Sequence, residues 1–257
     1  MAFNGKILTI TGGSGGIGTA VAKRFTDAGG TVLLLGRSEE KGRATEKACG
    51  PGATFIRCDV SNADDVANVF EMIDAEYGGI DFAVNNAGVT TPYVSLDKVE
   101  VSDWRKVLSI NLDGVFYAMK HQLPMLIRRQ GSAIVNVSSC AGVVPIPMQA
   151  AYVASKSAVN ALTRATALEY ATESGGLFPV RINAVAPGPT LGGMNTPERL
   201  AAHPQNTERK RNSTAMRRFG TPDEIVNVIE WLLSDKSSFV TGQVISPDGG
   251  YNAGKIL

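Results

Sequence analysis

The feature that most constrains the fold is a regular alternation of short apolar runs with longer amphipathic stretches. Runs of strand-forming residues occupy 6–10, 31–35, 53–57, 80–84, 132–137, 181–185 and 243–246, and helical patterns occupy 17–28, 39–48, 63–77, 101–129, 150–172 and 222–233. This alternation is typical of a parallel sheet with helices on both faces. Right-handed crossovers then predict a doubly wound α/β sheet of about seven strands in the order 3-2-1-4-5-6-7.

Composition indicates one ordinary globular domain over residues 1–257. Hydrophobic residues make up 44% of the chain, charged residues 19%, and the formal net charge is +1. Without a basic surplus we expect neither nucleic acid nor a membrane surface as a partner. Cys49, Cys58 and Cys140 are too few and too scattered for a disulfide framework or a metal site, so we expect no metal. With no apolar run of transmembrane length and no signal-peptide pattern, the expected location is cytoplasmic.

The first strand runs directly into a glycine-rich segment, Thr11-Gly-Gly-Ser-Gly-Gly-Ile-Gly18, and a helical pattern follows. Glycines let a backbone approach a pyrophosphate, while the helix N-terminus offers unpaired amides. The spacing fits G-x-G-x-x-G through Gly13, Gly15 and Gly18, and it fits T-G-x3-G-x-G through Gly12, Gly16 and Gly18. The segment predicts a dinucleotide site; alone it would also suit a glycine-rich turn without a ligand.

A second group of residues suggests proton transfer. Tyr152 and Lys156 are four residues apart in a predicted helix and therefore share one face, and Ser139 ends a predicted strand thirteen residues before the tyrosine. A phenol is a poor acid or base at neutral pH, but a nearby ammonium lowers its pKa. A serine hydroxyl can hold a carbonyl oxygen while the phenol gives it a proton.

With these segments the chain resembles a short-chain dehydrogenase/reductase of the compact single-domain kind. Matching segments follow in family order from residue 6 to residue 250, at 11–18, 58–60, 85–88, Asn111, Ser139, 152–156, 187–188 and 247–250. The resemblance implies a Rossmann-type fold. It also implies an NAD(P)-dependent oxidoreductase that interconverts a secondary alcohol and a ketone by hydride transfer. One alternative is a dehydratase or epimerase of the same fold. Another is a non-catalytic cofactor-binding regulator, which is disfavoured because Asn111, Ser139, Tyr152 and Lys156 are all present.

The resemblance also assigns roles to the four catalytic candidates. Tyr152 would pass the proton, Ser139 would hold the substrate oxygen, and Lys156 would lower the phenol pKa and hold the nicotinamide ribose. Asn111 would kink its helix and hold a water that relays protons to Lys156. Of the adjacent serines, the thirteen-residue interval selects Ser139, which leaves Ser138 for packing or a backbone hydrogen bond.

The same resemblance places the cofactor along the ends of the strands. Asp59 would accept a hydrogen bond from the adenine amino group, and 85–88 would lie against the adenosine ribose and brace the central strands. Where Gly192 stands, the family commonly has a threonine that touches the nicotinamide carboxamide. We therefore expect the backbone at Thr190 to do part of the work of holding the nicotinamide. The predicted cofactor contacts are Gly12, Ser14, Gly15, Gly16, Ile17, Gly18, Gly36, Arg37, Ser38, Cys58, Asp59, Val60, Asn86, Ala87, Gly88, Tyr152, Lys156, Pro187, Gly188 and Thr190.

The end of the second strand favours NADP over NAD. An NAD site usually has a carboxylate there, whereas this chain has Gly36, followed by Arg37, whose guanidinium can bind a 2′-phosphate. Ser38 adds a hydroxyl, although it could equally cap the next helix. Gly15 stands where many NADP-using relatives carry a second basic residue. NAD therefore remains possible, with Arg37 stacked on adenine.

The polar segment 190–216 follows the sixth strand, where a substrate lid would lie; a disordered surface loop is the alternative. An apolar wall at 145–148 and a basic lid are compatible with a 3-oxoacyl thioester, a sugar alcohol, a steroid or a biosynthetic intermediate as the small-molecule substrate. The helices 103–129 and 152–170 are more apolar than one sheet face requires, and residues 240–245 add apolar area near an edge. We therefore expect a homo-oligomer, a tetramer or else a dimer.

Overall fold

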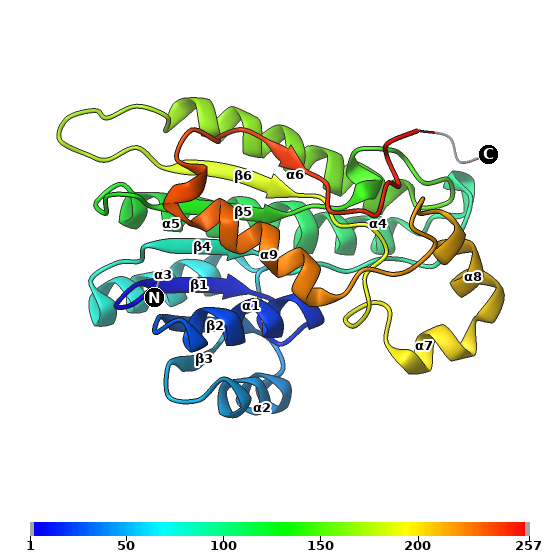
Figure 1. Cartoon of the computed structure of the whole chain (residues 1–257), viewed down its shortest axis with the longest axis horizontal. Helices are drawn as coiled ribbons and strands as arrows, with labels where there is room; N and C mark the ends of the chain where they lie inside the picture. The colour runs from blue at the N-terminus through cyan, green and yellow to red at the C-terminus, as the bar shows by residue number, and fades with distance from the viewer. Residues whose placement is uncertain (1–2, 255–257) are drawn as a thin grey trace.

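The computed structural model describes residues 3–254. Its centre is a seven-stranded sheet in the order β3-β2-β1-β4-β5-β6-β7, and every neighbouring pair of strands is parallel (Figure 1). The strands are β1 (Ile7–Thr11), β2 (Thr31–Gly36), β3 (Ala53–Arg57), β4 (Phe82–Asn85), β5 (Ala133–Val137), β6 (Arg181–Val185) and β7 (Val244–Ile245). The predicted fold class and strand order are confirmed.

Helices cover both faces of the sheet. They are α1 (Gly16–Asp27), α2 (Glu39–Cys49), α3 (Ala63–Tyr77), α4 (Val101–Leu108), α5 (Gly114–Leu126), α6 (Ala150–Glu169), α7 (Pro197–Ala202), α8 (Pro204–Asn212) and α9 (Pro222–Leu233). One apolar core includes Phe25 of α1 and Ile229 of α9; the other includes Phe70 of α3, Val115 of α5 and Val159 of α6. The two cores lie on opposite faces, and in Figure 1 α1 and α9 lie in front of the sheet. Within residues 3–254 no helix is long and apolar enough to cross a membrane.

Two segments differ from the simplest prediction. The pattern over 101–129 suggests one helix, and the family resemblance implies a kink at Asn111. A π-helical turn, Ser109–Asp113, contains Asn111 and separates α4 from α5. Segment 190–216 is not an irregular loop, because it contains α7 and α8, each beginning with a proline in its first turn. In Figure 1 these two helices lie at the end toward which the strands point, which is the ligand side of open parallel sheets.

Candidate active site

The glycine-rich turn after β1 is shaped by close backbone packing. Gly12 has φ +65°, and a Cβ there would lie 2.9 Å from the Cα of Ala87. A Cβ on Gly18 would overlap the carbonyl oxygen of Gly12. The Thr11 hydroxyl accepts hydrogen bonds from the amides of Asn86 at 3.0 Å and Ala87 at 3.2 Å, which fixes this turn to the one after β4. Packing within the protein therefore already requires glycine at two predicted nucleotide contacts.

The first turn of α1 has no side chain of its own that would compete with an anion. Its N-cap is Gly15, which has no side chain to satisfy the helix amides, and the turn contains no acidic residue. Free amides and the positive end of the helix dipole favour a bound phosphate. Ile17 packs against the core behind this turn. The turn thus fits the diphosphate of a dinucleotide.

The ends of β2 and β3 provide the neighbouring polar edge. A Cβ on Gly36 would lie 3.7 Å from the Phe55 ring and 3.8 Å from the Ser14 hydroxyl, so a larger residue has room there. Arg37 is exposed beside it. The Ser38 hydroxyl accepts a hydrogen bond from the amide of Lys41 at 3.4 Å, so it caps α2.

Asp59 lies at the same edge. Its carboxylate accepts hydrogen bonds from the hydroxyl of Ser61 at 2.7 Å and the amide of Ser61 at 3.1 Å. Burial raises the pKa of Asp59, but these hydrogen bonds, with help from Arg37 and Arg57, outweigh it and lower the pKa. The helix that follows is capped by Asn62, so Asp59 is not its cap. Cys58 and Val60 beside it are buried.

A network of buried amides holds the turn after β4 in place. Asn85 donates to Asn136 on β5 at 2.9 Å and exchanges two hydrogen bonds with Gln122 on α5. The side-chain amide of Asn86 donates to the carbonyl of Gly12 at 3.0 Å. This is the bracing expected of the Asn-Asn-Ala-Gly segment.

Ser139 and Tyr152 face one another across the gap between β5 and α6. The Ser139 hydroxyl accepts a hydrogen bond from the amide of Ala141 at 3.1 Å and also lies within reach of the phenol. Burial raises the pKa of Tyr152 to about 12, hydrogen bonding to Ser139 counteracts part of this rise, and Cys140 and Tyr93 add to it. Although part of the tyrosine surface remains exposed, the phenol is protonated at neutral pH.

Lys156 is buried one helical turn further along α6. Its Nζ donates to the carbonyl of Val137 at 2.8 Å, and burial lowers the pKa of the amine to about 8. Lys156 is not among the groups that shift the pKa of Tyr152 in this arrangement, in which its amine is bound to the end of β5. The Ser138 hydroxyl donates to the Lys156 carbonyl at 3.1 Å, a backbone hydrogen bond of the kind expected for it.

Asn111 explains the π-helical turn between α4 and α5. Its side chain accepts from the amide of Val89 at 2.8 Å and donates to the carbonyl of Val89 at 2.9 Å and to the Ser155 hydroxyl at 3.1 Å. A Cβ on Gly88 would lie 3.4 Å from the side-chain oxygen of Asn111 and 3.5 Å from Nζ of Lys156. The side chains of Asn111 and Lys156 thus both lie beside Gly88, at ordinary contact distance from where a side chain would begin. π-Helical turns are frequent at functional sites.

Several residues of this region were not found by sequence reasoning. A Cβ on Gly142 would lie 2.7 Å from the carbonyl carbon of Lys156, and Asn160 donates to the Gly142 carbonyl at 2.9 Å. These contacts press the segment after Ser139 against α6. Ser155, which binds Asn111, could have been predicted because it lies between Tyr152 and Lys156 in the Tyr-Val-Ala-Ser-Lys string. No local pattern marks Gly142 or Asn160.

The mouth of the site is formed by distant parts of the chain. Burial raises the pKa values of Tyr93 and Tyr251. The charge of Arg209 on α8 lowers both pKa values, and Cys140 raises both. Because such charge effects act over short distances, these four groups lie near one another. Val143, Val144 and Met148 are 43%, 39% and 49% exposed on the loops beside Ser139 and before α6. Of these three, only Met148 belongs to the apolar wall predicted at 145–148, which stays a prediction. Cys140 itself is a buried free thiol whose pKa burial raises to about 11.

The turn after β6 packs against the C-terminal turn. A Cβ on Gly188 would lie 2.7 Å from the Cα of Asp248, and the Asp248 carboxylate accepts from the amides of Gly250 at 2.9 Å and Tyr251 at 3.1 Å. The Pro187 carbonyl accepts from the amide of Cys140 at 2.9 Å, and the Thr190 hydroxyl donates to the Gly188 carbonyl at 2.9 Å.

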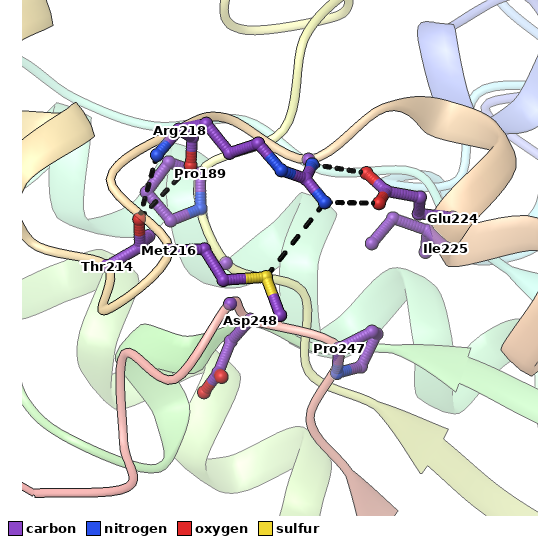
Figure 2. Close-up of a pocket in the computed structure, with 11 residues that line it drawn as sticks. Pro189, Thr214, Met216, Arg218, Glu224, Ile225, Pro247 and Asp248 are labelled. Atoms are coloured by element: carbon purple, nitrogen blue, oxygen red, sulfur yellow. Dashed lines mark hydrogen bonds and ion pairs between the residues drawn. The ribbon is translucent and has the colours of Figure 1, made fainter.

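A cavity of about 190 Å³ lies beside this turn. Figure 2 shows the residues that line it. Met216 and the Arg218–Glu224 ion pair lie on one side of it, and Pro247 and Asp248 lie on the other. The residues of 3–254 that line this cavity do not include the four catalytic candidates. It therefore lies at the base of segment 190–216 and not at the reactive centre.

Comparison with known proteins places this geometry in a family. Residues 12–252 match a family model described as enoyl-(acyl carrier protein) reductase. A 3beta-hydroxysteroid dehydrogenase of Mediterraneibacter gnavus is 38% identical, with 97% of this chain and 95% of that protein covered. A 2,5-dichloro-2,5-cyclohexadiene-1,4-diol dehydrogenase of Sphingobium indicum is 37% identical, with 98% of each covered. The structure of the aldohexose dehydrogenase of Thermoplasma acidophilum superposes with a TM-score of 0.85 at 33% identity, covering 99% of this chain and 96% of that one. The fold, the glycine-rich turn and these relatives agree, and the chain belongs to the short-chain dehydrogenase/reductase family.

Proposed function

We propose that this protein is an NAD(P)-dependent oxidoreductase that interconverts a secondary alcohol and a ketone. The observation that carries the proposal is the convergence of Ser139, Tyr152, Lys156 and Asn111 at the carboxyl end of the sheet. They lie beside a glycine-rich turn whose helix N-terminus has no capping side chain or acid. Relatives that are dehydrogenases of cyclic alcohols support the same reaction class.

The chain itself would manage the proton. A bound nicotinamide supplies or accepts the hydride. In reduction, Ser139 would hold the substrate oxygen and Tyr152, protonated at neutral pH, would donate to it. In oxidation, Tyr152 must accept a proton, so its pKa has to fall. Lys156 would lower it if its amine left the Val137 carbonyl to hold the ribose hydroxyls. Asn111 would hold a water that returns the proton toward Lys156.

For the substrate we propose a cyclic secondary alcohol or its ketone. The exposed side chains of Val143, Val144 and Met148 give the mouth an apolar wall, and segment 190–216 would act as the lid over it. A panel containing a 3-hydroxysteroid, a cyclohexanediol, an aldohexose and a 3-oxoacyl thioester, each followed by nicotinamide absorbance, tests this choice. Turnover confined to the thioester would contradict the cyclic class. Product formed with no net change in cofactor redox state would favour a dehydratase or epimerase.

The cofactor preference is expected to be for NADP(H). Gly36 leaves room for a 2′-phosphate, and Arg37 and Ser14 lie beside that space. The double variant Gly36→Asp, Arg37→Ile would introduce a repelling carboxylate and remove the guanidinium, so kcat/KM should shift toward NADH. The measurement is kcat/KM for NADPH and NADH on one substrate. A native preference for NADH, or a double variant that keeps its preference for NADPH, would show that this edge does not select the cofactor.

We also propose that the protein assembles as a homo-oligomer, a tetramer in preference to a dimer. Phe116 of α5 and Leu168 of α6 are 48% and 82% exposed, and Phe239 is fully exposed near β7. Large apolar side chains on outer helices and at a sheet edge are typical of surfaces that pair symmetrically. Multi-angle light scattering at micromolar concentration should give the mass of four chains, and a mass of one chain would rule out the proposal.

A further inference from the structure

A turn of segment 190–216 lies directly on the glycine-rich turn. A Cβ on Gly16 would lie 2.9 Å from the amide nitrogen of Gly193 and 3.2 Å from the carbonyl carbon of Gly192. Gly192 and Gly193 have φ +79° and +52°, which glycine adopts readily. The contact is therefore between two backbones with no side chain between them. It lies over the first turn of α1, where the dinucleotide phosphates are expected.

Asn195 organises this turn. Gly192 and Asn195 exchange backbone hydrogen bonds of 3.1 and 2.8 Å, and the side-chain amide of Asn195 donates to the Thr190 carbonyl at 2.9 Å. The side-chain oxygen of Asn195 in turn accepts from Nζ of Lys210 on α8 at 2.7 Å. One asparagine thus connects the Gly192–Gly193 turn with a helix fifteen residues further along the chain.

Lys210 is partly withdrawn from water, unlike an ordinary surface lysine. It is half-buried, and its pKa is lowered, first by burial and then by the nearby Arg199. Taking a cation out of water is unfavourable unless a hydrogen bond compensates, and the carboxamide oxygen of Asn195 provides one. Its neighbour Arg211, in contrast, is exposed and pairs with Glu208 within the same helix.

The rest of the segment is held by separate contacts. The Thr207 hydroxyl donates to the Leu200 carbonyl at 2.8 Å, which joins α8 to α7. After α8, the amide of Met216 donates to the Gly249 carbonyl at 3.0 Å. Loss of the Lys210–Asn195 contact would therefore leave the two helices folded and the end of α8 attached at the C-terminal turn, but it would uncouple α8 from the Gly192–Gly193 turn.

We propose that Lys210 and Asn195 are positioning residues that hold the Gly192–Gly193 turn over the bound dinucleotide and slow its release. The inference rests on the proposed function only in requiring that a dinucleotide binds at the glycine-rich turn. This chain has glycine at 192, so no side chain there can hold the nucleotide. Closure then depends on where the backbone is placed. The amide of Leu191 donates to the Gly220 carbonyl at 2.9 Å before the turn, and the Lys210–Asn195 contact holds the turn on its other side.

The test measures cofactor release from the full-length protein. Bound NADPH, and NADH in parallel, is displaced by excess oxidised dinucleotide in a stopped-flow instrument, and the loss of bound-cofactor fluorescence gives the dissociation rate. Lys210→Met should release the dinucleotide about tenfold faster, the scale of one charge-assisted hydrogen bond. The rate of the hydride step in a single turnover should not change. Lys210→Arg should restore most of the retention, and Arg211→Met is the matched control that should behave as the native protein.

Asn195→Ala and the double variant Asn195→Ala, Lys210→Met show whether the two residues act through one contact. If they do, Lys210→Met should add little to the dissociation rate in the Asn195→Ala background. Multiplied effects in the double variant, or a Lys210→Met rate equal to that of Arg211→Met, would overturn the proposal. Neither outcome depends on turnover. A protein that binds NADPH but catalyses no hydride transfer would therefore contradict the proposed function and leave this test intact.

Discussion

Replacing Tyr152 with phenylalanine is expected to lower kcat at least ~100-fold and to leave dinucleotide affinity unchanged. This loss is the lower scale of general acid catalysis. The change removes only the hydroxyl beside Ser139, while the uncapped first turn of α1 and the Asn85–Asn136 network remain. The measurement is kcat on the best substrate of the panel, together with NADPH affinity by fluorescence titration.

Tyr170→Phe is the matched control for this change. Tyr170 is the C-cap of the same helix α6 and packs against the apolar core, so its hydroxyl lies away from the strand ends. This variant should keep native kcat. Near-native turnover of purified Tyr152→Phe would contradict the assignment of the proton to the phenol, whatever the cofactor affinity.

Replacing Lys156 with methionine is expected to abolish turnover and to stabilise the cofactor-free protein. Burial depresses the pKa of this amine from 10.5 to about 8, which at neutral pH corresponds to a cost of about 3 kcal/mol for burying the ammonium. Losing the hydrogen bond to the Val137 carbonyl offsets about 1 kcal/mol. The free energy of unfolding at pH 7 should therefore rise by about 2 kcal/mol.

The pH dependence tests this reasoning. Below pH 8 the amine is protonated in both the folded and the unfolded protein, so the full cost is present. As pH rises from 8 toward 10.5, the unfolded chain binds more protons at this site than the folded one, and the native protein regains stability. The advantage of Lys156→Met in urea unfolding should thus shrink across this range. An exposed control, Lys120→Met, should show no such trend, and an advantage that grows with pH would contradict the burial cost.

The sequence was sufficient for the fold where local signals set the element boundaries. Residues 63–77 form a helix as predicted because Asn62 caps its start and Gly78 ends it in the left-handed conformation. The helix from Pro222 begins with a capping box of Thr221 and Glu224, and proline in its first turn strengthens the signal. The glycine-rich turn was likewise recognised from a strand and a helix on either side of it.

Features that depend on distant partners could not be predicted. The resemblance implied a kink at Asn111, but no local propensity indicates the hydrogen bonds between its side chain and Val89, twenty-two residues away, that accompany the π-helical turn. The direction of the Lys156 amine is set by the carbonyl of Val137 on another element. Tyr93, Arg209 and Tyr251 meet only through the three-dimensional fold, so the mouth of the site was not visible in the sequence.

The central claim is hydride transfer between a nicotinamide and a carbonyl carbon, and isotope transfer tests it most directly. The protein is incubated with NADPH carrying deuterium at C4 in each stereochemical position, together with the ketone that the panel identifies, and the alcohol is analysed by mass spectrometry and NMR. One of the two labelled cofactors should place a single deuterium on the carbinol carbon, and the same experiment on Tyr152→Phe should yield almost no labelled alcohol. A product that carries no deuterium from either cofactor would contradict the claim.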